Sequence, residues 1–245
     1  MSAGRTSTGT NAANAERTST SSSEAPQLVG RVHDIAQLLK VLLKEYGEPR
    51  WWTGDAFEVA IGAILTQRTS WRNVDFALAN LKSKGLMSPS AIAKAKSAEI
   101  EKAIWPSGFY RQKARYLRAF SLFVVERYGG NMAGMKRRPL TVLRTELLEI
   151  PGIGPETADS ILLYGLGMPS FVVDAYTFRL LDRLGMRPGR DYDKLKSRFE
   201  KELRADTKNM ANMHALIVEH CKRQCTTGPR CGECCVSTHC PSKRE

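Results

Sequence analysis

Hydrophobic side chains recur at intervals of three and four residues from Val29 onward, which is the spacing of amphipathic helices. Val32, Ile35, Leu38 and Leu42 give the first such stretch. The same spacing predicts further helices over residues 55–65, 71–82, 97–104, 111–128, 140–149, 156–166, 174–184, 192–203 and 208–220. Gly and Pro residues separate these stretches, and no alternating run is long enough to predict a sheet. The sequence therefore predicts an all-α protein, without internal repeats.

The first 27 residues have a different composition. They are rich in Ser, Thr, Ala and Gly and contain almost no large apolar side chain. Such a segment buries too little apolar surface to offset the entropy lost on ordering. We therefore expect residues 1–27 to be a disordered tail.

The net charge of the chain indicates which kind of partner it binds. Its 245 residues include 37 Lys and Arg against 25 Asp and Glu, a formal net charge of +12. This excess favours a polyanion, with nucleic acid first and an anionic membrane surface second. No stretch reaches the roughly 18 apolar residues of a membrane span, and the amino terminus has no signal-peptide core. We expect an intracellular protein, in the cytoplasm or nucleoid if prokaryotic, with no membrane partner.

A Gly- and Pro-rich turn joins the helices predicted over 140–149 and 156–166, and it reads Pro-Gly-Ile-Gly-Pro. Gly152 and Gly154 permit positive φ and a close approach of another molecule to the backbone. Pro155 suits the first turn of a helix, whose free amide groups can bind phosphate. A plain corner between helices is the alternative. The basic composition favours a hairpin that contacts the DNA backbone.

Residues 147–185 resemble the helix-hairpin-helix, the Gly/Pro-rich loop and the aspartate of the endonuclease III superfamily of DNA glycosylases. Residues 63–70, AILTQRTS, are similar to the family segment whose glutamine enters the duplex, and residues 108–114, GFYRQKA, resemble a further family element. The resemblance covers residues from about 29 to 240. It implies a base excision repair enzyme that acts, as a monomer, on double-stranded DNA containing a damaged base.

The same resemblance implies a domain organisation. Two helical lobes are expected around a DNA-binding cleft, within a glycosylase domain over 28–220. The helical bundle would form within about 50–140, and the second lobe from 28–49 and 141–220. Residues 221–245 would form an iron–sulfur cluster loop and the carboxy terminus.

Asp174 follows two small apolar residues after the hairpin and begins a predicted helix. On its own it is a favoured N-cap. The resemblance implies that it is the catalytic aspartate. Breaking an N-glycosidic bond builds positive charge on the sugar, and a nearby carboxylate can stabilise that charge and orient a water.

In the bifunctional members of the family, a lysine in the hairpin attacks the sugar and forms an imine. Glu156 stands at that position here, directly before Thr157 and Ala158. A carboxylate cannot form an imine. We therefore expect a monofunctional hydrolase that leaves an abasic site, although lysines elsewhere could give weak lyase activity.

All six cysteines lie between Cys221 and Cys240. Cys225, Cys231, Cys234 and Cys240 have the spacing C-x5-C-x2-C-x5-C, one residue shorter in the first interval than the family pattern for a [4Fe–4S] cluster. The resemblance implies that these four are the ligands, with Cys221 as an alternative first ligand and Cys235 as a bystander. Tetrahedral zinc is the rival interpretation of the same thiol set.

A glycosylase must turn its target base out of the duplex and hold it in a pocket. The resemblance makes Gln67 the residue that fills the vacated space, and the hairpin residues expected to contact DNA are Gly152, Gly154, Glu156 and Thr157.

Trp51, Trp52 and Tyr176 are the expected substrate pocket, with core packing as the alternative for the tryptophan pair. Electron-rich rings suit a cationic alkylated purine. With Glu156 and the run Ile161-Leu162-Leu163-Tyr164 in the hairpin helix, these residues make the chain most similar to the 3-methyladenine DNA glycosylase III branch. An enzyme for oxidised pyrimidines or mismatches with lyase activity remains the alternative. A non-catalytic DNA-binding iron–sulfur module is a remote one, against which Asp174 in its motif argues. The preferred lesion and opposite base stay open.

Overall fold

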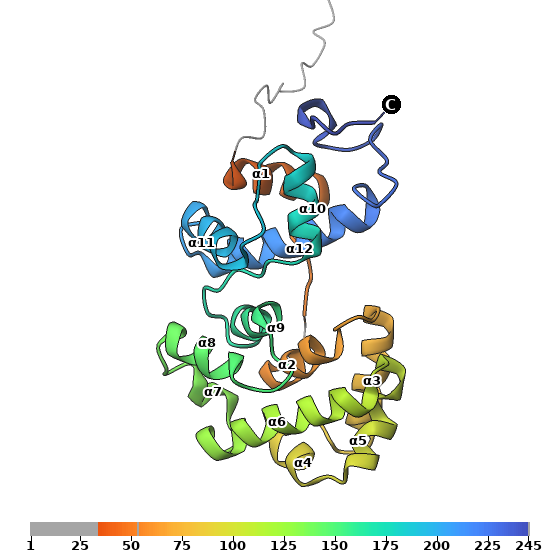
Figure 1. The fold of residues 1–245 in the computed structure, drawn as a ribbon, viewed down its shortest axis with the longest axis vertical. Helices are drawn as coiled ribbons and strands as arrows, with labels where there is room; N and C mark the ends of the chain where they lie inside the picture. The colour runs from red at the N-terminus through yellow and green to blue at the C-terminus, as the bar shows by residue number, and fades with distance from the viewer. Residues whose placement is uncertain (1–33, 53, 245) are drawn as a thin grey trace, which may run out of the picture. The chain divides into compact units, whose positions relative to one another are not determined.

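The computed structural model describes residues 34–52 and 54–244, and within these ranges the chain forms helices and connecting loops without any strand (Figure 1). The predicted all-α class is confirmed for this part of the chain. The tail predicted over residues 1–27 lies outside the described residues. No helix in the described ranges is long and apolar enough to cross a membrane.

The helices follow one another in the order shown by the colours of Figure 1. They are α1 (Ile35–Tyr46), α2 (Ala56–Leu65), α3 (Trp71–Ser83), α4 (Pro89–Lys94), α5 (Ser97–Ile104), η1 (Trp105–Ser107), α6 (Tyr110–Tyr128), α7 (Met132–Met135), α8 (Leu140–Leu148), α9 (Pro155–Ser160), η2 (Ile161–Gly165), α10 (Ala175–Arg183), α11 (Tyr192–Glu202), α12 (Thr207–Arg223) and η3 (Ser237–His239). The hydrophobic spacing predicted the longer helices. It did not predict α4 and α7, which are too short to show a period.

Aspartate N-caps fix the start of several helices. Asp55 accepts hydrogen bonds from the backbone N–H groups of Phe57 and Glu58, each at 2.9 Å, and so begins α2. Asp34 and Asp206 cap α1 and α12 in the same way. Each cap satisfies amide groups that have no partner inside the helix.

A first buried cluster surrounds α2, whose residues from Val59 to Leu65 are all buried. α6 packs against α4 and α5, while α2 contacts α3, α6 and α9. This cluster also takes in Leu143 and Leu147 of α8. It therefore extends past residue 140, the limit expected for the helical bundle, and the domain boundaries themselves stay a prediction.

A second buried cluster is formed by α1, α10, α11 and α12. α1 packs along α12, and the ring of Phe171 stacks on that of Phe199 with centroids 3.9 Å apart. Cys225 and Val236, from the segment after α12, complete this cluster.

The short helix η2 carries the chain from one cluster to the other. It is a π-helical turn that continues α9. Leu162 packs in the first cluster and Leu163 in the second. Such wide turns occur mostly as single insertions in α-helices, frequently at functional sites.

Candidate active site

The predicted hairpin is present between α8 and α9. Gly152 lies in the turn with φ +85°, and a Cβ added there would come within 2.2 Å of the Tyr116 ring. Only glycine can therefore occupy this position without displacing the turn. Gly154 is the N-cap of α9 and has no side chain to cap it, and Pro155 follows in the first turn. This arrangement leaves the helix start open to an anion.

The hairpin and the end of α2 together line an open cavity of about 700 Å³. The Gln67 side chain spans it, because Nε2 donates hydrogen bonds to the carbonyl oxygen of Gly152 at 2.8 Å and to Oγ1 of Thr157 at 3.1 Å. All five predicted DNA-contacting residues line this cavity: Gln67, Gly152, Gly154, Glu156 and Thr157. The structure thus brings together residues up to 90 positions apart in the sequence.

Asp174 is the N-cap of α10, and one of its carboxylate oxygens is held by Thr177. Oδ1 accepts from the backbone N–H of Thr177 at 2.7 Å and from its hydroxyl at 2.8 Å. The other oxygen, Oδ2, lies 3.7 Å from Nε2 of His214 on α12. Burial alone would raise the pKa of Asp174, but His214 and Thr177 outweigh it and hold that pKa below its usual value. Asp174 is therefore an ionised carboxylate at neutral pH.

Glu156 lies within electrostatic reach of Asp174. Its side chain is exposed to water through the hairpin cavity, yet protein atoms surround it closely on its other sides. This enclosure raises the pKa of Glu156, and the charge of Asp174 raises it further, while His214 lowers it. The two carboxyl groups thus have pKa values displaced in opposite directions, as acid and base pairs in active sites often do.

An aromatic cluster adjoins His214. Nδ1 of His214 lies 2.6 Å from the hydroxyl oxygen of Tyr164, whose ring stacks on Trp52 with centroids 5.6 Å apart. Trp52 in turn contacts Trp71 at 4.9 Å, and Trp51 meets His214 edge-on at 6.3 Å. The cluster therefore extends from the immediate neighbour of Asp174 to the surface of α3.

A cavity of about 370 Å³ opens beside this cluster. Its aromatic lining is Trp51, Trp52 and Trp71, and Glu58, Asp75 and Lys222 are among its charged lining residues. Lys222 lies over the Trp51 ring, 5.7 Å from its centroid. Val59, which also lines this cavity, is on α2 about one turn before Ala63, which lines the hairpin cavity. Both cavities are thus lined in part by α2.

The sequence pointed to only part of this cluster. It predicts Trp71 only as the start of a helix and Tyr164 only as part of the hairpin-helix run 161–164, and it gives no sign of a role for His214. Their contacts join residues about 50 positions apart, which no spacing rule detects. Tyr176, expected in the pocket, instead packs on the second cluster beneath the Arg179 guanidinium, 5.0 Å from its ring centroid.

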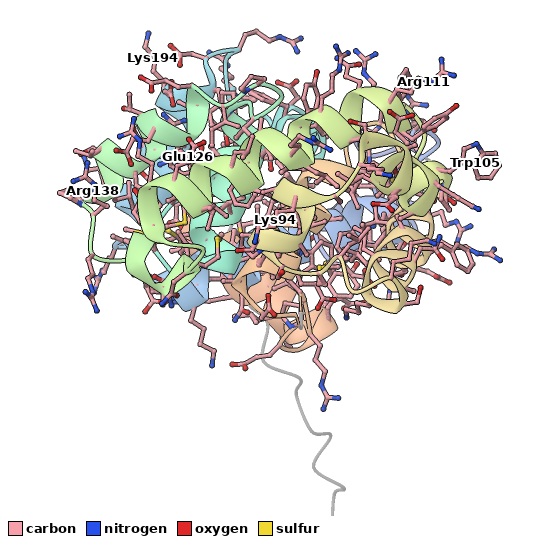
Figure 2. The ribbon with its side chains drawn as sticks, turned by 90° about the horizontal axis from the view of Figure 1, so that it is seen from below. Lys94, Trp105, Arg111, Glu126, Arg138 and Lys194 are labelled. Atoms are coloured by element: carbon pink, nitrogen blue, oxygen red, sulfur yellow. The ribbon has the colours of Figure 1, made fainter. Side chains whose placement is uncertain are left out.

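Two exposed aromatic side chains precede α6. Phe109 is 60% exposed, has a φ of +46° and lines a smaller cavity with Gln67 and Arg68. Trp105 is 66% exposed and projects from the ribbon in Figure 2, as does Arg111. Backbone strain and apolar exposure at Phe109 together mark a contact surface beside Gln67.

The four cysteines predicted as ligands lie near one another. Burial raises the pKa of Cys234, and so do the thiols of Cys225, Cys231 and Cys240, which are therefore within electrostatic reach. Arg183 Nη1 donates to Cys225 Sγ at 3.2 Å, which fastens the loop to α10. Four free thiols on one loop are the donor set that a [4Fe–4S] cluster uses.

The two remaining cysteines also interact with this group: Cys221 shares a hydrogen bond with Cys225, and Cys235 lies within electrostatic reach of Cys234. Cys221 donates to the carbonyl oxygen of Tyr176, and Cys235 lies within reach of Glu45 on α1. Within residues 34–52 and 54–244, however, no three His, Cys, Asp or Glu side chains are arranged closely enough to hold a metal ion. The thiol donors therefore fit the predicted cofactor, although their side chains in the described residues are not arranged as a metal site.

Residues 61–205 match the HhH-GPD superfamily of base excision DNA repair proteins. A Methanocaldococcus jannaschii protein that carries the name of a DNA repair glycosylase is 44% identical over 212 residues, covering 85% of this chain and 96% of its own length. Endonuclease III of Thermotoga maritima is 32% identical, covering 84% of this chain and 92% of the relative.

Solved structures agree with these matches. The H. pylori 3-methyladenine DNA glycosylase bound to 1,N6-ethenoadenine has a TM-score of 0.70 and 31% identity, over 78% of this chain and 98% of that one. An endonuclease III in a non-covalent complex with DNA has a TM-score of 0.73 at 22% identity, over 85% of this chain and 94% of that one, and shows a shared fold.

Proposed function

Because the chain belongs to the HhH-GPD superfamily of base excision DNA repair proteins and is a DNA glycosylase, we propose that it releases alkylated purines such as 3-methyladenine and leaves the DNA strand intact. The observation that carries the substrate proposal is the cavity beside Trp51, Trp52 and Trp71, because its lining residue Trp51 meets the ring of His214, the neighbour of Asp174. The similarity to the H. pylori glycosylase supports the same substrate class.

The aromatic cavity suits a flat cationic base. An N3- or N7-alkylated purine carries positive charge, which the π faces of tryptophans attract. The cavity, at about 370 Å³, lies in the size range of small-molecule sites. Lys222 lies over Trp51, so the rings of Trp52 and Trp71 are the ones proposed to contact the base. Glu58 and Asp75 add carboxylates at the same cavity, where Arg50 and Lys222 add cations. Glu58 is also paired with Lys82 at 2.6 Å.

Asp174 is the proposed catalytic residue. Its lowered pKa keeps it charged, and Thr177 fixes the direction of its carboxylate. Once the base is turned out, Asp174 would stabilise the positive charge on the sugar and orient the water that attacks C1′. A cationic purine is a good leaving group, so cleavage of its glycosidic bond needs little further acid catalysis by the protein.

Glu156 supports hydrolysis without strand cleavage. It occupies the hairpin position beside Asp174 and has no amine with which to form an imine. We therefore propose that the enzyme hydrolyses the glycosidic bond without cleaving the strand. Glu156 would contact DNA together with Gly152, Gly154 and Thr157. Gln67 and the neighbouring exposed Phe109 would occupy the space that the base leaves.

Cys225, Cys231, Cys234 and Cys240 are the proposed ligands of a [4Fe–4S] cluster. When bound, the cluster would cross-link the loop after α12 through its four thiolates and add to folding stability. The Arg183 contact to Cys225 would then tie that loop to α10, the helix that Asp174 begins.

The test is base release from methylated duplex DNA. We expect free 3-methyladenine, strands that break only after heating in alkali, and no adduct on borohydride treatment. The similarity to the Thermotoga maritima endonuclease III favours the alternative, a glycosylase with lyase activity for oxidised pyrimidines. Borohydride trapping, or preference for thymine glycol over methylated purines, would establish that alternative.

A further inference from the structure

A fully buried carboxylate lies on α9, one turn beyond the hairpin. Asp159 has no exposed surface, and its oxygens accept four hydrogen bonds. Arg144 on α8 donates two of them, from Nε at 2.9 Å and Nη2 at 3.1 Å. Ser170 Oγ donates at 2.6 Å and the Tyr192 hydroxyl at 2.9 Å. A buried charge of this kind is costly and often stabilises a protein less than apolar packing would, so its presence calls for a role beyond packing.

Two of the partners of Asp159 lead to the segment that carries Asp174. Ser170 belongs to the segment between η2 and α10. Tyr192, on α11, donates to Asp159 and accepts a hydrogen bond from the backbone N–H of Val173 at 3.4 Å. Val173 immediately precedes Asp174. A continuous set of hydrogen bonds thus joins the hairpin helix to the backbone of Val173, the residue before Asp174.

The segment 166–174 depends on such side chains. The N–H groups of residues 166, 168 and 170 donate to backbone carbonyl oxygens, whereas those of Phe171 and Val173 have side-chain acceptors. Phe171 N–H donates to Oε1 of Glu200, again on α11, at 3.0 Å. Burial and the neighbouring Asp159 raise the pKa of Tyr192, so its hydroxyl keeps the proton that it donates. α11 therefore supplies acceptors at both Phe171 and Val173.

We propose that Asp159 and Tyr192 are positioning residues that hold the Asp174 carboxylate at a fixed distance from the hairpin. The hairpin would grip the DNA backbone while Asp174 acts on one sugar, so the geometry between them decides whether the carboxylate faces C1′. A misplacement of about 1 Å can cost on the order of 100-fold in rate. This inference rests on the role proposed above for Asp174.

The test is Tyr192→Phe, which removes one oxygen and keeps the ring. We expect the single-turnover rate of base release to fall about 10- to 100-fold, with the Kd for a duplex bearing an uncleavable abasic analogue changed less than twofold. Asp159→Asn should act in the same direction, and the double variant should lose less than the product of the two effects. If Asp159→Asn fails to fold, Tyr192→Phe carries the test alone.

Tyr128→Phe is the matched control. It also deletes a tyrosine hydroxyl that donates to a carboxylate, Oε2 of Glu146 at 2.7 Å, but in the first cluster. We expect its rate to stay within twofold of the wild type. An equal loss of rate in both variants, or an unchanged rate in Tyr192→Phe, would overturn the proposal.

Amide hydrogen exchange at Val173 and Asp174 gives a readout that does not need activity. Exchange should accelerate in Tyr192→Phe and stay unchanged in Tyr128→Phe. If the wild type releases no base from any lesion, the proposed function fails while this measurement still decides whether Tyr192 holds the segment. Unchanged exchange in Tyr192→Phe would remove Tyr192 from the positioning role.

Discussion

Gly152→Ala tests whether the hairpin has only one workable conformation. The added methyl group would lie 2.2 Å from Cγ and Cδ2 of Tyr116, and Cγ is at the root of the ring, so a small rotation cannot relieve the contact. The backbone there has a φ of +85°. Left-handed backbone costs a non-glycine residue about 1–2 kcal/mol, and overpacking adds about 1–3 kcal/mol. We therefore expect a loss of about 2–5 kcal/mol in the free energy of unfolding.

The assay is urea unfolding at 25 °C, with DNA binding measured by fluorescence anisotropy on an abasic duplex. Gly154→Ala is the control, because Gly154 has a φ of −89° and an added Cβ would meet nothing within 4 Å. It should cost at most about 1 kcal/mol, the difference between good and poor N-cap residues. Tyr116→Ala should rescue part of the Gly152→Ala loss, since it removes the clash and leaves the backbone strain.

Two results would refute this reasoning. A loss below about 1 kcal/mol for Gly152→Ala would mean that the turn has room to relax. Strict additivity of Gly152→Ala and Tyr116→Ala would mean that the ring is not what the methyl group meets.

Four further predictions test the chemistry. Asp174→Asn should lower base release by at least about 100-fold, the usual range for acid–base groups, with abasic-duplex binding retained; near-normal release would exclude its catalytic role. Glu156→Gln should raise Tm near pH 8 but not near pH 4. The raised pKa of Glu156 means that folding favours its protonated form, and this contribution to stability is lost as the pH rises. An equal shift in Tm at both pH values would contradict this. Cys231→Ala should abolish the iron content of purified protein, while Cys235→Ala should preserve it. Wild-type protein that contains zinc and no iron would show that the four thiols form a zinc site instead of a cluster. Trp71→Ala should weaken release of 3-methyladenine about tenfold or more, with Kd for the abasic duplex unchanged; a uniform loss of DNA binding would place Trp71 outside the base pocket.

The sequence predicted those parts of the site that a continuous motif encodes. Gly152, Gly154 and Glu156 belong to one turn, and Gln67 to a short similar segment, so each could be identified without knowledge of the fold. Helices of at least two turns were also predictable, because burial of one face imposes a period.

The rest depends on long-range contacts. His214 faces Asp174 only because α12 packs beside α10, and Tyr164 faces His214 only because of where η2 ends. A lone histidine or tyrosine within an amphipathic pattern gives no sign of such a partner. Tyr176 lies two residues after Asp174, an offset that places the side chains on different faces of a helix, and its ring packs under Arg179. Its place in the substrate pocket stays a prediction.

The π-helical turn η2 limits how the chain can vary in length. A residue deleted between Ile161 and Gly165 would tighten the wide turn to a regular α-helical turn, so the loss could be absorbed there without rotating the residues that follow. A deletion within α9 that left η2 unchanged would instead rotate the following residues by about 100° around the helix axis, which would take Tyr164 away from His214 and Leu163 out of the second cluster. We therefore expect single-residue deletions among homologues to fall within 161–165 rather than within 155–160, where they would separate the aromatic cluster from Asp174 while each half of the protein could still pack.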